Sequence, residues 1–347
     1  MRNSSPALLL ALALASCSQP SGIPSASLKD AVGDKFLVGV ALNQRQVSGA
    51  DSLGAETARK HFNCIVAENC MKCEKIHPAP GIYDFAAADS LVSFATRDSM
   101  KVVGHCLIWH SQLAPWFCVD TLGNPVSPEE LLRRMKDHIT TVVSRYKGKV
   151  IGWDVVNEAF LDDGSWRPSP FYEILGEDYL PFAFRCAAEA DPEAELYYND
   201  YCMFRPAKRQ AVVSMISRLK AEGIRIDAVG MQSHLGIDYP EPEEFERSIL
   251  AFSGAGVNVM ITEWDMSALP TLSESADVSA STLQAQGDGG RYPDCLPDSV
   301  CRLWNSRMAD FFSIMLRHSD VITRVTAWGV SDGDSWKNNY PVRGRRD

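Results

Sequence analysis

Val150-Ile-Gly-Trp-Asp-Val-Val-Asn-Glu158 is the stretch of sequence that decides the fold. It is a short run of mainly apolar residues that ends in an amide and a carboxylate. A strand with two apolar faces is typical of a buried parallel sheet, because a half-exposed strand would alternate apolar and polar residues. The polar pair at its end therefore marks the edge where such a sheet meets solvent.

Seven further runs of this kind bring the number of candidate strands to eight. The eight candidate strands, with the opening run included, are Val38–Leu42, Cys64–Ala67, Val102–Ile108, Val150–Val156, Leu196–Tyr198, Ala228–Met231, Val257–Thr262 and Val325–Val330. The clearest helical patterns in the gaps are Glu129–Tyr146, Phe171–Ala190, Ala207–Glu222, Glu243–Phe252 and Leu303–Arg317. Eight strands alternating with helices predict an α/β fold, a (β/α)₈ TIM barrel. Residues 331–347 carry no helical pattern, so we expect the last helix to be missing and the chain to be truncated.

The first residues are expected to lie outside the barrel. Residues 1–16 combine an early basic residue with an apolar run too short for a permanent membrane span, which predicts a signal peptide. Leu14-Ala-Ser-Cys17 resembles a bacterial lipobox, which implies a lipid on Cys17; a plain signal peptide with a nearby cysteine is the alternative. Residues 17–30 would form a tether and 31–347 the barrel. We expect an exported lipoprotein, membrane-anchored at the cell surface or the periplasmic face.

Charge and cysteine content exclude several functions. The net charge of −10 argues against nucleic acid as a partner. The first strand lacks a glycine-rich phosphate loop, and the Cys70-Met-Lys-Cys73 pair lacks a second pair for zinc, so we predict no cofactor and no metal. Most cysteines lie in apolar segments and should be buried. Cys295 and Cys301 lie in a loop-like stretch, and the sequence leaves a disulfide between them open.

Polar side chains gather at the predicted C-terminal strand ends, where barrels of this kind carry their active sites. Glu158 and Glu263 each follow an apolar run directly, and glycoside hydrolysis uses two carboxyl groups that flank the bond. One such glutamate alone could be a solvated loop residue. Two on separate strands, the first preceded by Asn157, favour a catalytic pair in which one is protonated and the other ionised.

Seven motifs, in order along the chain, resemble glycoside hydrolase family 10, the endo-β-1,4-xylanases. They are Glu68-Asn-Cys-Met-Lys72, Gly104-His-Cys-Leu-Ile-Trp-His110, Trp153-Asp-Val-Val-Asn-Glu158, Leu196-Tyr-Tyr-Asn-Asp-Tyr201, Gly230-Met-Gln-Ser-His234, Ile261-Thr-Glu-Trp-Asp265 and Trp328-Gly-Val-Ser-Asp-Gly-Asp-Ser-Trp336. An isolated Asn-Glu pair is shared by many barrel hydrolases, so the ordered set carries the resemblance. It implies retaining hydrolysis of internal bonds in xylan or xylo-oligosaccharides. We expect the protein to be a monomer.

The resemblance also implies roles for individual residues. Glu158 would be the general acid and base, and Glu263 the nucleophile. His234 would bond Glu263, with Asp265 orienting its imidazole. The residues implied to bind substrate are Glu68, Asn69, Lys72, His105, Trp109, Asn157, Tyr201, Gln232, His234, Trp328 and Trp336. Tyr201 could instead serve in packing.

Two other functions stay open at this point. Another retaining barrel β-glycanase, such as a cellulase or a mannanase, would share both glutamates. The segment Glu68–Lys72 and the segment Trp328–Trp336 favour a xylanase over it. A surface lipoprotein that binds xylan without cleaving it would be indicated by the loss of either glutamate, and both are present.

Overall fold

The computed structural model describes residues 26–269, 292 and 295–339. The predicted signal peptide, Cys17 and most of the predicted tether lie outside the described residues. Within the described part of the chain, no helix is both long enough and apolar enough to cross a membrane.

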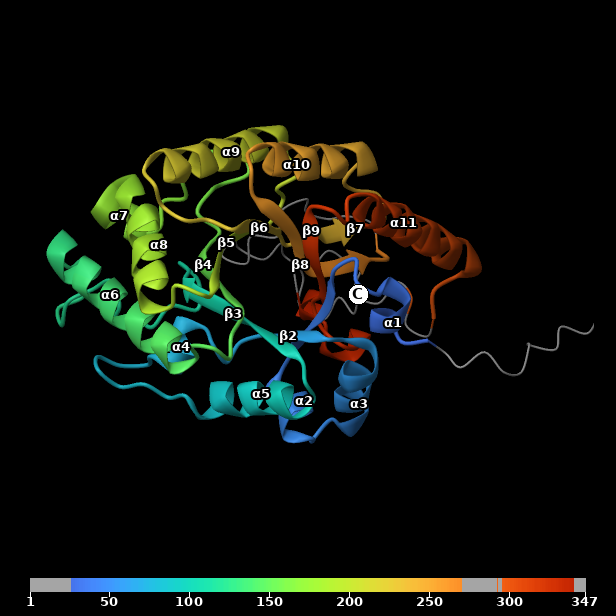
Figure 1. Ribbon diagram of the computed structural model, residues 1–347, viewed down its shortest axis with the longest axis horizontal. Coiled ribbons are helices and arrows are strands. Elements are labelled where there is room, and N and C mark those ends of the chain that lie inside the picture. Colours follow the sequence, from blue (N-terminus) through green and yellow to red (C-terminus); the bar gives the residue numbers. More distant parts are fainter. Residues whose placement is uncertain (1–25, 270–291, 293–294, 340–347) are drawn as a thin grey trace, which may run out of the picture.

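Eight parallel strands form a closed barrel (Figure 1). They are β1 (Leu37–Leu42), β2 (Cys64–Ala67), β3 (Lys101–Ile108), β4 (Gly152–Asn157), β5 (Glu195–Asp200), β6 (Ala228–Met231), β8 (Asn258–Ser267) and β9 (Ile322–Ala327). Strands β1 to β6 pair in chain order, β9 pairs with β1 and β8, and β8 pairs with β6 to complete the ring. The predicted (β/α)₈ barrel is confirmed. The short strand β7 (His234–Gly236), which the sequence did not suggest, pairs with the end of β8.

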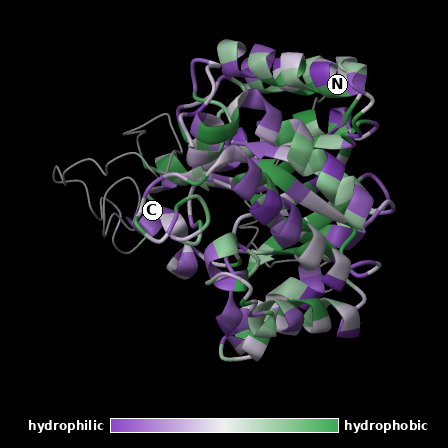
Figure 2. Ribbon diagram, turned by 90° about the vertical axis from the view of Figure 1, so that its left-hand side faces the viewer, coloured by the Kyte–Doolittle hydropathy of each residue, from purple (hydrophilic) through white to green (hydrophobic). Residues whose placement is uncertain are grey.

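Helices surround the barrel on its outside (Figure 1). They are α1 (Leu28–Val32), α2 (Gln44–Ser48), α3 (Ser52–His61), α4 (Cys73–Ile76), α5 (Ala86–Arg97), α6 (Pro128–Arg145), α7 (Pro170–Leu175), α8 (Tyr179–Ala190), α9 (Pro206–Ala221), α10 (Pro242–Gly254) and α11 (Asp298–Arg317). The outer helices carry both hydrophilic and hydrophobic residues (Figure 2). One predicted helix, Phe171–Ala190, is instead two, because Gly176 ends α7 with a positive φ of 63°.

The chain beyond β9 continues as two short 3₁₀ turns, η2 (Asp332–Asp334) and η3 (Trp336–Asn339). No α-helix follows β9 in the described residues, which reach Asn339. The expected truncation concerns the chain after that point and stays a prediction.

The layer between the barrel and its outer helices is tightly filled, and Trp153 of β4 lies in it near Tyr146 at the end of α6. Trp153 is fully buried and lies directly against Gly104, where an added Cβ would come within 2.0 Å of the indole. Only glycine fits there. Seven of the nine described cysteines are buried, as expected, whereas Cys295 and Cys301 are exposed and free, without the disulfide that the sequence left open.

Candidate active site

A cavity of about 340 Å³ opens at the C-terminal ends of the barrel strands. Twelve of the fourteen residues that line it were predicted from the sequence motifs: Glu68, Asn69, Lys72, His105, Trp109, Asn157, Glu158, Gln232, His234, Glu263, Trp328 and Trp336. The other two are Ser111 and Gln112, which the motifs did not single out. One cleft therefore gathers residues from strands far apart in the sequence.

Tyr201 is the exception among the proposed substrate-binding residues. It is not part of the cavity lining, and only 1% of it is exposed. Arg167 Nη2 donates to the Tyr201 hydroxyl at 2.6 Å. The alternative reading of Tyr201 as a packing residue fits this position.

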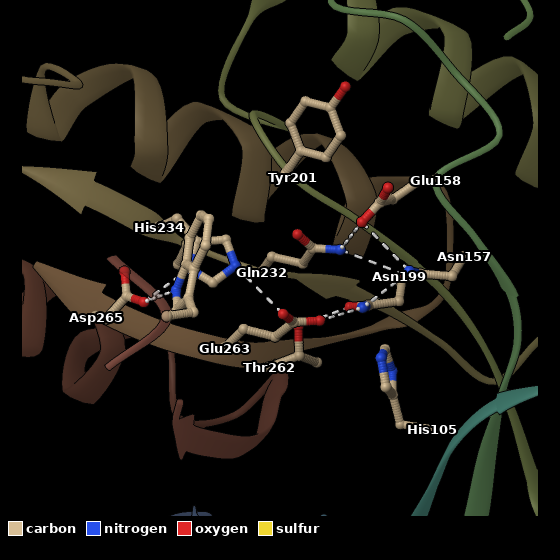
Figure 3. Close-up of polar contacts among 12 residues, drawn as sticks. His105, Asn157, Glu158, Asn199, Tyr201, Gln232, His234, Thr262, Glu263 and Asp265 are labelled. Atoms are coloured by element: carbon tan, nitrogen blue, oxygen red, sulfur yellow. Dashed lines mark hydrogen bonds and ion pairs between the residues drawn. The ribbon is translucent and has the colours of Figure 1, made fainter. Parts of the chain in front are cut away.

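Glu158 lies just beyond β4 and has a left-handed backbone, with φ 59°. Its Oε2 accepts from Trp109 Nε1 at 2.9 Å. Its Oε1 accepts from Gln232 Nε2 at 3.0 Å (Figure 3). Burial, followed by the nearby charge of Asp200, raises the pKa of Glu158 to about 7. This carboxyl can therefore hold a proton near neutral pH.

Glu263 on β8 has the opposite electrostatic environment. Its Oε1 accepts from Asn199 Nδ2 at 2.9 Å, and its Oε2 lies 3.2 Å from His234 Nε2. Burial alone would raise the pKa of Glu263, but the hydrogen bond from His234, followed by the electrostatic influence of His105 and His234, holds it below its ordinary value. Glu263 is therefore the ionised member of the pair.

His234 is held as an imidazolium between two carboxylates. Its Nδ1 lies 3.0 Å from Asp265 Oδ2, which also accepts from Trp336 Nε1 at 2.7 Å. Burial disfavours the charge, yet Asp265 and Glu263 raise the pKa of His234 to about 9. Burial likewise opposes ionisation of Asp265, but the charges of His234 and Lys337 lower its pKa to about 2. Both ring nitrogens of His234 can then donate.

Three side-chain amides join the two glutamates (Figure 3). Asn157 Oδ1 accepts from Asn199 Nδ2 at 2.9 Å and from Gln232 Nε2 at 3.3 Å. Thr262 Oγ1 donates to Asn199 Oδ1 at 2.6 Å, which fixes the orientation of that amide. Sequence reasoning assigned no role to Asn199 or Thr262, although both stand at the ends of predicted strands.

Another part of the cleft lining combines the buried amino group of Lys72 with the indole of Trp109. Lys72 Nζ donates to Gln112 Oε1 at 2.7 Å and to Asn69 Oδ1 at 3.1 Å, and it lies 4.9 Å from the centre of the Trp109 ring. Donors of this kind bind hydroxyl groups, and indoles pack against sugar rings. Gln112 was missed because it lies in the loop after β3, where no motif marks it.

A (β/α)₈ barrel whose cleft holds one glutamate with a raised pKa and one with a lowered pKa has the features of the barrel glycoside hydrolases. Within the described residues, no group of three His, Cys, Asp or Glu could hold a metal ion. The sequence profile of Glycosyl hydrolase family 10 matches residues 27–345, and the chain belongs to this family. The resemblance read from the seven motifs is thus confirmed.

Similar proteins support the same assignment. The chain is 48% identical over 340 residues to "Endo-1,4-beta-xylanase A" of Xylanibacter ruminicola, covering 97% of this chain and 90% of the relative. It is 37% identical to "Beta-1,4-xylanase" of Dictyoglomus thermophilum, covering 95% and 87%. A solved GH10 endoxylanase from a sugarcane soil metagenome superposes with a TM-score of 0.88 at 41% identity, covering 92% and 93%.

Proposed function

We propose that this chain is an endo-1,4-β-xylanase that hydrolyses internal β-1,4-xylosidic bonds by a retaining double displacement. The observation that carries the proposal is the pair of glutamates in one cleft with pKa values displaced in opposite directions, Glu158 upward and Glu263 downward. The relatives named as xylanases, of which the first is 48% identical, support xylan as the substrate.

In the first step, the Glu263 carboxylate attacks the anomeric carbon while Glu158 transfers its proton to the departing oxygen. A covalent glycosyl ester forms on Glu263, and the aglycone half of the chain leaves. His234 donates to Glu263 Oε2, so it holds the nucleophile ionised and limits its rotation.

In the second step, Glu158 is a carboxylate and accepts a proton from water. That water attacks the anomeric carbon from the side the aglycone left, which releases Glu263 and returns the original configuration. The amide of Asn157 contacts Glu158 directly and is linked to Glu263 through Asn199, and it can donate to the 2-hydroxyl of the reacting sugar.

The proposal is tested by incubating the purified protein with xylan, soluble cellulose and mannan, and by following the anomeric configuration of the products by NMR. We expect new reducing ends from xylan with β-configuration first. Glu158→Ala should lose about 10²- to 10⁴-fold in activity on xylan, and Glu263→Ala should lose at least as much. Glu243→Ala, at an exposed position on α10, is the matched control and should retain activity.

Each alternative has its own outcome in this experiment. Cleavage of cellulose or mannan without cleavage of xylan would refute the substrate assignment. Binding of xylan without turnover would support a surface polysaccharide-binding protein instead. Inverted products would exclude the double displacement.

We further propose that the protein is exported and anchored to a membrane through a lipid on Cys17, and that it acts as a monomer. The lipobox-like Leu14–Cys17 segment supports the anchor. Metabolic labelling with an alkyne fatty acid should label the wild-type chain but not Cys17→Ser. Protease added to intact cells should show which face of the membrane carries the protein.

The monomeric state is tested separately. Light scattering on the domain without its lipid anchor should give the mass of one chain.

A further inference from the structure

Next to the main chain of Glu158 lies a buried polar cluster that does not line the cleft, and of its members only Asp200, through its charge, has so far been given a part in the mechanism. Its members are Arg167, Tyr198, Asp200, Tyr201 and Lys208. Tyr198, Asp200 and Lys208 are all 0% exposed. Burying charged groups completely costs free energy, so the presence of Asp200 and Lys208 in this cluster needs an explanation.

The cluster surrounds the main chain of the general acid. All four polar main-chain atoms of Glu158 and Ala159 are hydrogen-bonded. Glu158 N donates to Asn199 O at 2.9 Å, and Ala159 N donates to the Tyr198 hydroxyl at 3.0 Å. Arg167 completes the set: its Nε donates to Glu158 O at 2.9 Å and its main-chain N donates to Ala159 O at 2.8 Å.

The Tyr198 hydroxyl is itself oriented by the ion pair. It donates its single hydrogen to Asp200 Oδ2, which leaves its lone pairs for the N–H of Ala159. Asp200 is held in turn by Lys208, whose Nζ lies 2.6 Å from Asp200 Oδ1, and by the main-chain N of Tyr201 at 2.8 Å. Lys208 Nζ also lies 3.6 Å from the centre of the Tyr201 ring.

The conformation of Glu158 explains why such support is useful. Its φ of 59° lies in the left-handed region, which a residue with a side chain adopts only when its surroundings enforce it. A relaxation of this backbone would swing the carboxyl away from its partners in the cleft. For stability alone, apolar residues could replace a buried ion pair.

We propose that Tyr198, oriented by the Asp200–Lys208 pair, is a positioning residue for Glu158: its hydroxyl fixes the Glu158–Ala159 peptide and so aims the acid at the leaving oxygen. This inference rests on the proposed function of Glu158 and deepens it. Tyr198 touches no substrate and acts only through the main chain.

The test uses the dependence of acid catalysis on the leaving group. A 2,4-dinitrophenolate departs without a proton, whereas a sugar hydroxyl needs one, and kcat/KM reports the glycosylation step for both substrates. In Tyr198→Phe we expect kcat/KM on xylohexaose to fall about tenfold, because small misplacements of a catalytic group are costly. With 2,4-dinitrophenyl β-xylobioside, kcat/KM should stay within about twofold of wild type.

Tyr197→Phe is the matched control. Tyr197 is the neighbour on β5, and its hydroxyl also donates to a carboxylate, Glu195 Oε2 at 2.6 Å. Its side chain instead packs inside the barrel against Cys64, Val103 and Met260. The loss of this buried hydroxyl should affect both substrates equally. Because each ratio is taken on one preparation, it does not depend on the fraction of folded protein.

A second measurement examines the base step. Azide attacks the glycosyl-enzyme without needing a base, so it should accelerate turnover of the dinitrophenyl substrate by Tyr198→Phe and leave Tyr197→Phe unchanged. Equal losses on the two substrates in Tyr198→Phe, or no response to azide, would overturn the inference. An inactive wild-type protein would instead refute the proposed function.

Discussion

The charge on Asp265 offers the sharpest test of how the nucleophile is kept ionised. Asp265→Asn keeps the size of the side chain but removes the negative charge that lies 3.0 Å from His234 Nδ1. The pKa of His234 should then fall, so that a larger fraction of the imidazole is neutral at neutral pH. A neutral imidazole stabilises the Glu263 carboxylate less, so the pKa of Glu263 should rise.

The size of the effect follows from the pKa of His234. Its two carboxylate partners raise this pKa from 6.5 to about 9 despite burial. At about 1.4 kcal/mol per pKa unit, their attraction exceeds the cost of burying the charge by roughly 3 kcal/mol. Asp265 supplies the larger part of that attraction. We therefore expect the pKa of Glu263 to rise by about one unit or more in Asp265→Asn.

The assay is the pH dependence of kcat/KM on xylohexaose. Glu263 must be ionised for attack, and its pKa in the wild type is depressed, so activity is present above that pKa and is lost as the pH falls through it. In Asp265→Asn the acidic limb should move to higher pH, while the basic limb, set by Glu158, stays in place. The pair titrates as a coupled system, so the limbs report apparent values.

A matched control removes a carboxylate elsewhere at the rim of the cleft. Asp334 accepts from Asn43 and Gln46 and pairs with Arg45, but it does not contact His234. Asp334→Asn should leave the acidic limb unmoved. The explanation of how Glu263 is kept ionised would be refuted by two observations on Asp265→Asn together. These are an acidic limb that does not move, and an NMR spectrum that shows the His234 imidazole still protonated at pH 7.

Three further outcomes are expected. Trp109→Phe removes a hydrogen bond that lowers the pKa of Glu158, so the basic limb of kcat/KM, near pH 7 in the wild type, should move to higher pH. Lys72→Met should raise KM on xylo-oligosaccharides about tenfold with little change in kcat, because a charged donor contributes about 1.5 kcal/mol to binding. Gly104→Ala should lower the free energy of unfolding in urea by about 3 kcal/mol or more, because its Cβ would collide with Trp153.

Each of these variants has a counterpart elsewhere in the chain. Trp116→Phe also removes an indole N–H donor, but one that bonds His77 O outside the cleft, and it should not move the basic limb. Lys75→Met, on the exposed side of α4, should leave KM unchanged. Gly254→Ala, where an added Cβ meets no atom within 4 Å, should not destabilise the protein. If a variant and its control changed the pH profile, the KM or the free energy of unfolding to the same extent, the contact assigned as the cause of that change would be wrong.

The barrel and the two glutamates could be predicted because their signals are local. Each buried strand is a short apolar run, and Glu158 and Glu263 follow such runs directly. The ends of elements were less accurate: the eighth strand, expected at Val325–Val330, is Ile322–Ala327. The break at Gly176 was missed because apolar spacing continues across it into α8.

The supporting contacts could not be predicted, because they join residues that only the closed barrel brings together. Lys337 reaches Asp265 across 72 positions. Lys208 lies only eight positions after Asp200, but a lysine in a predicted helix gives no sign in the sequence that it is buried. Tyr198 looks like one of two equivalent tyrosines in the sequence. Only the structure shows that the Tyr198 hydroxyl accepts from the main-chain N of Ala159, whereas Tyr197 packs inside the barrel.

The amide links between the glutamates have a consequence for how protons are kept apart. Asn157, Asn199 and Gln232 donate and accept hydrogen bonds but do not change protonation state at any pH at which the protein is folded. A chain of hydroxyls or imidazoles in the same place could pass a proton from Glu158 to Glu263 and equalise them. Because the amides do not relay a proton, the two carboxyl groups can lie in one small cleft and still differ in protonation.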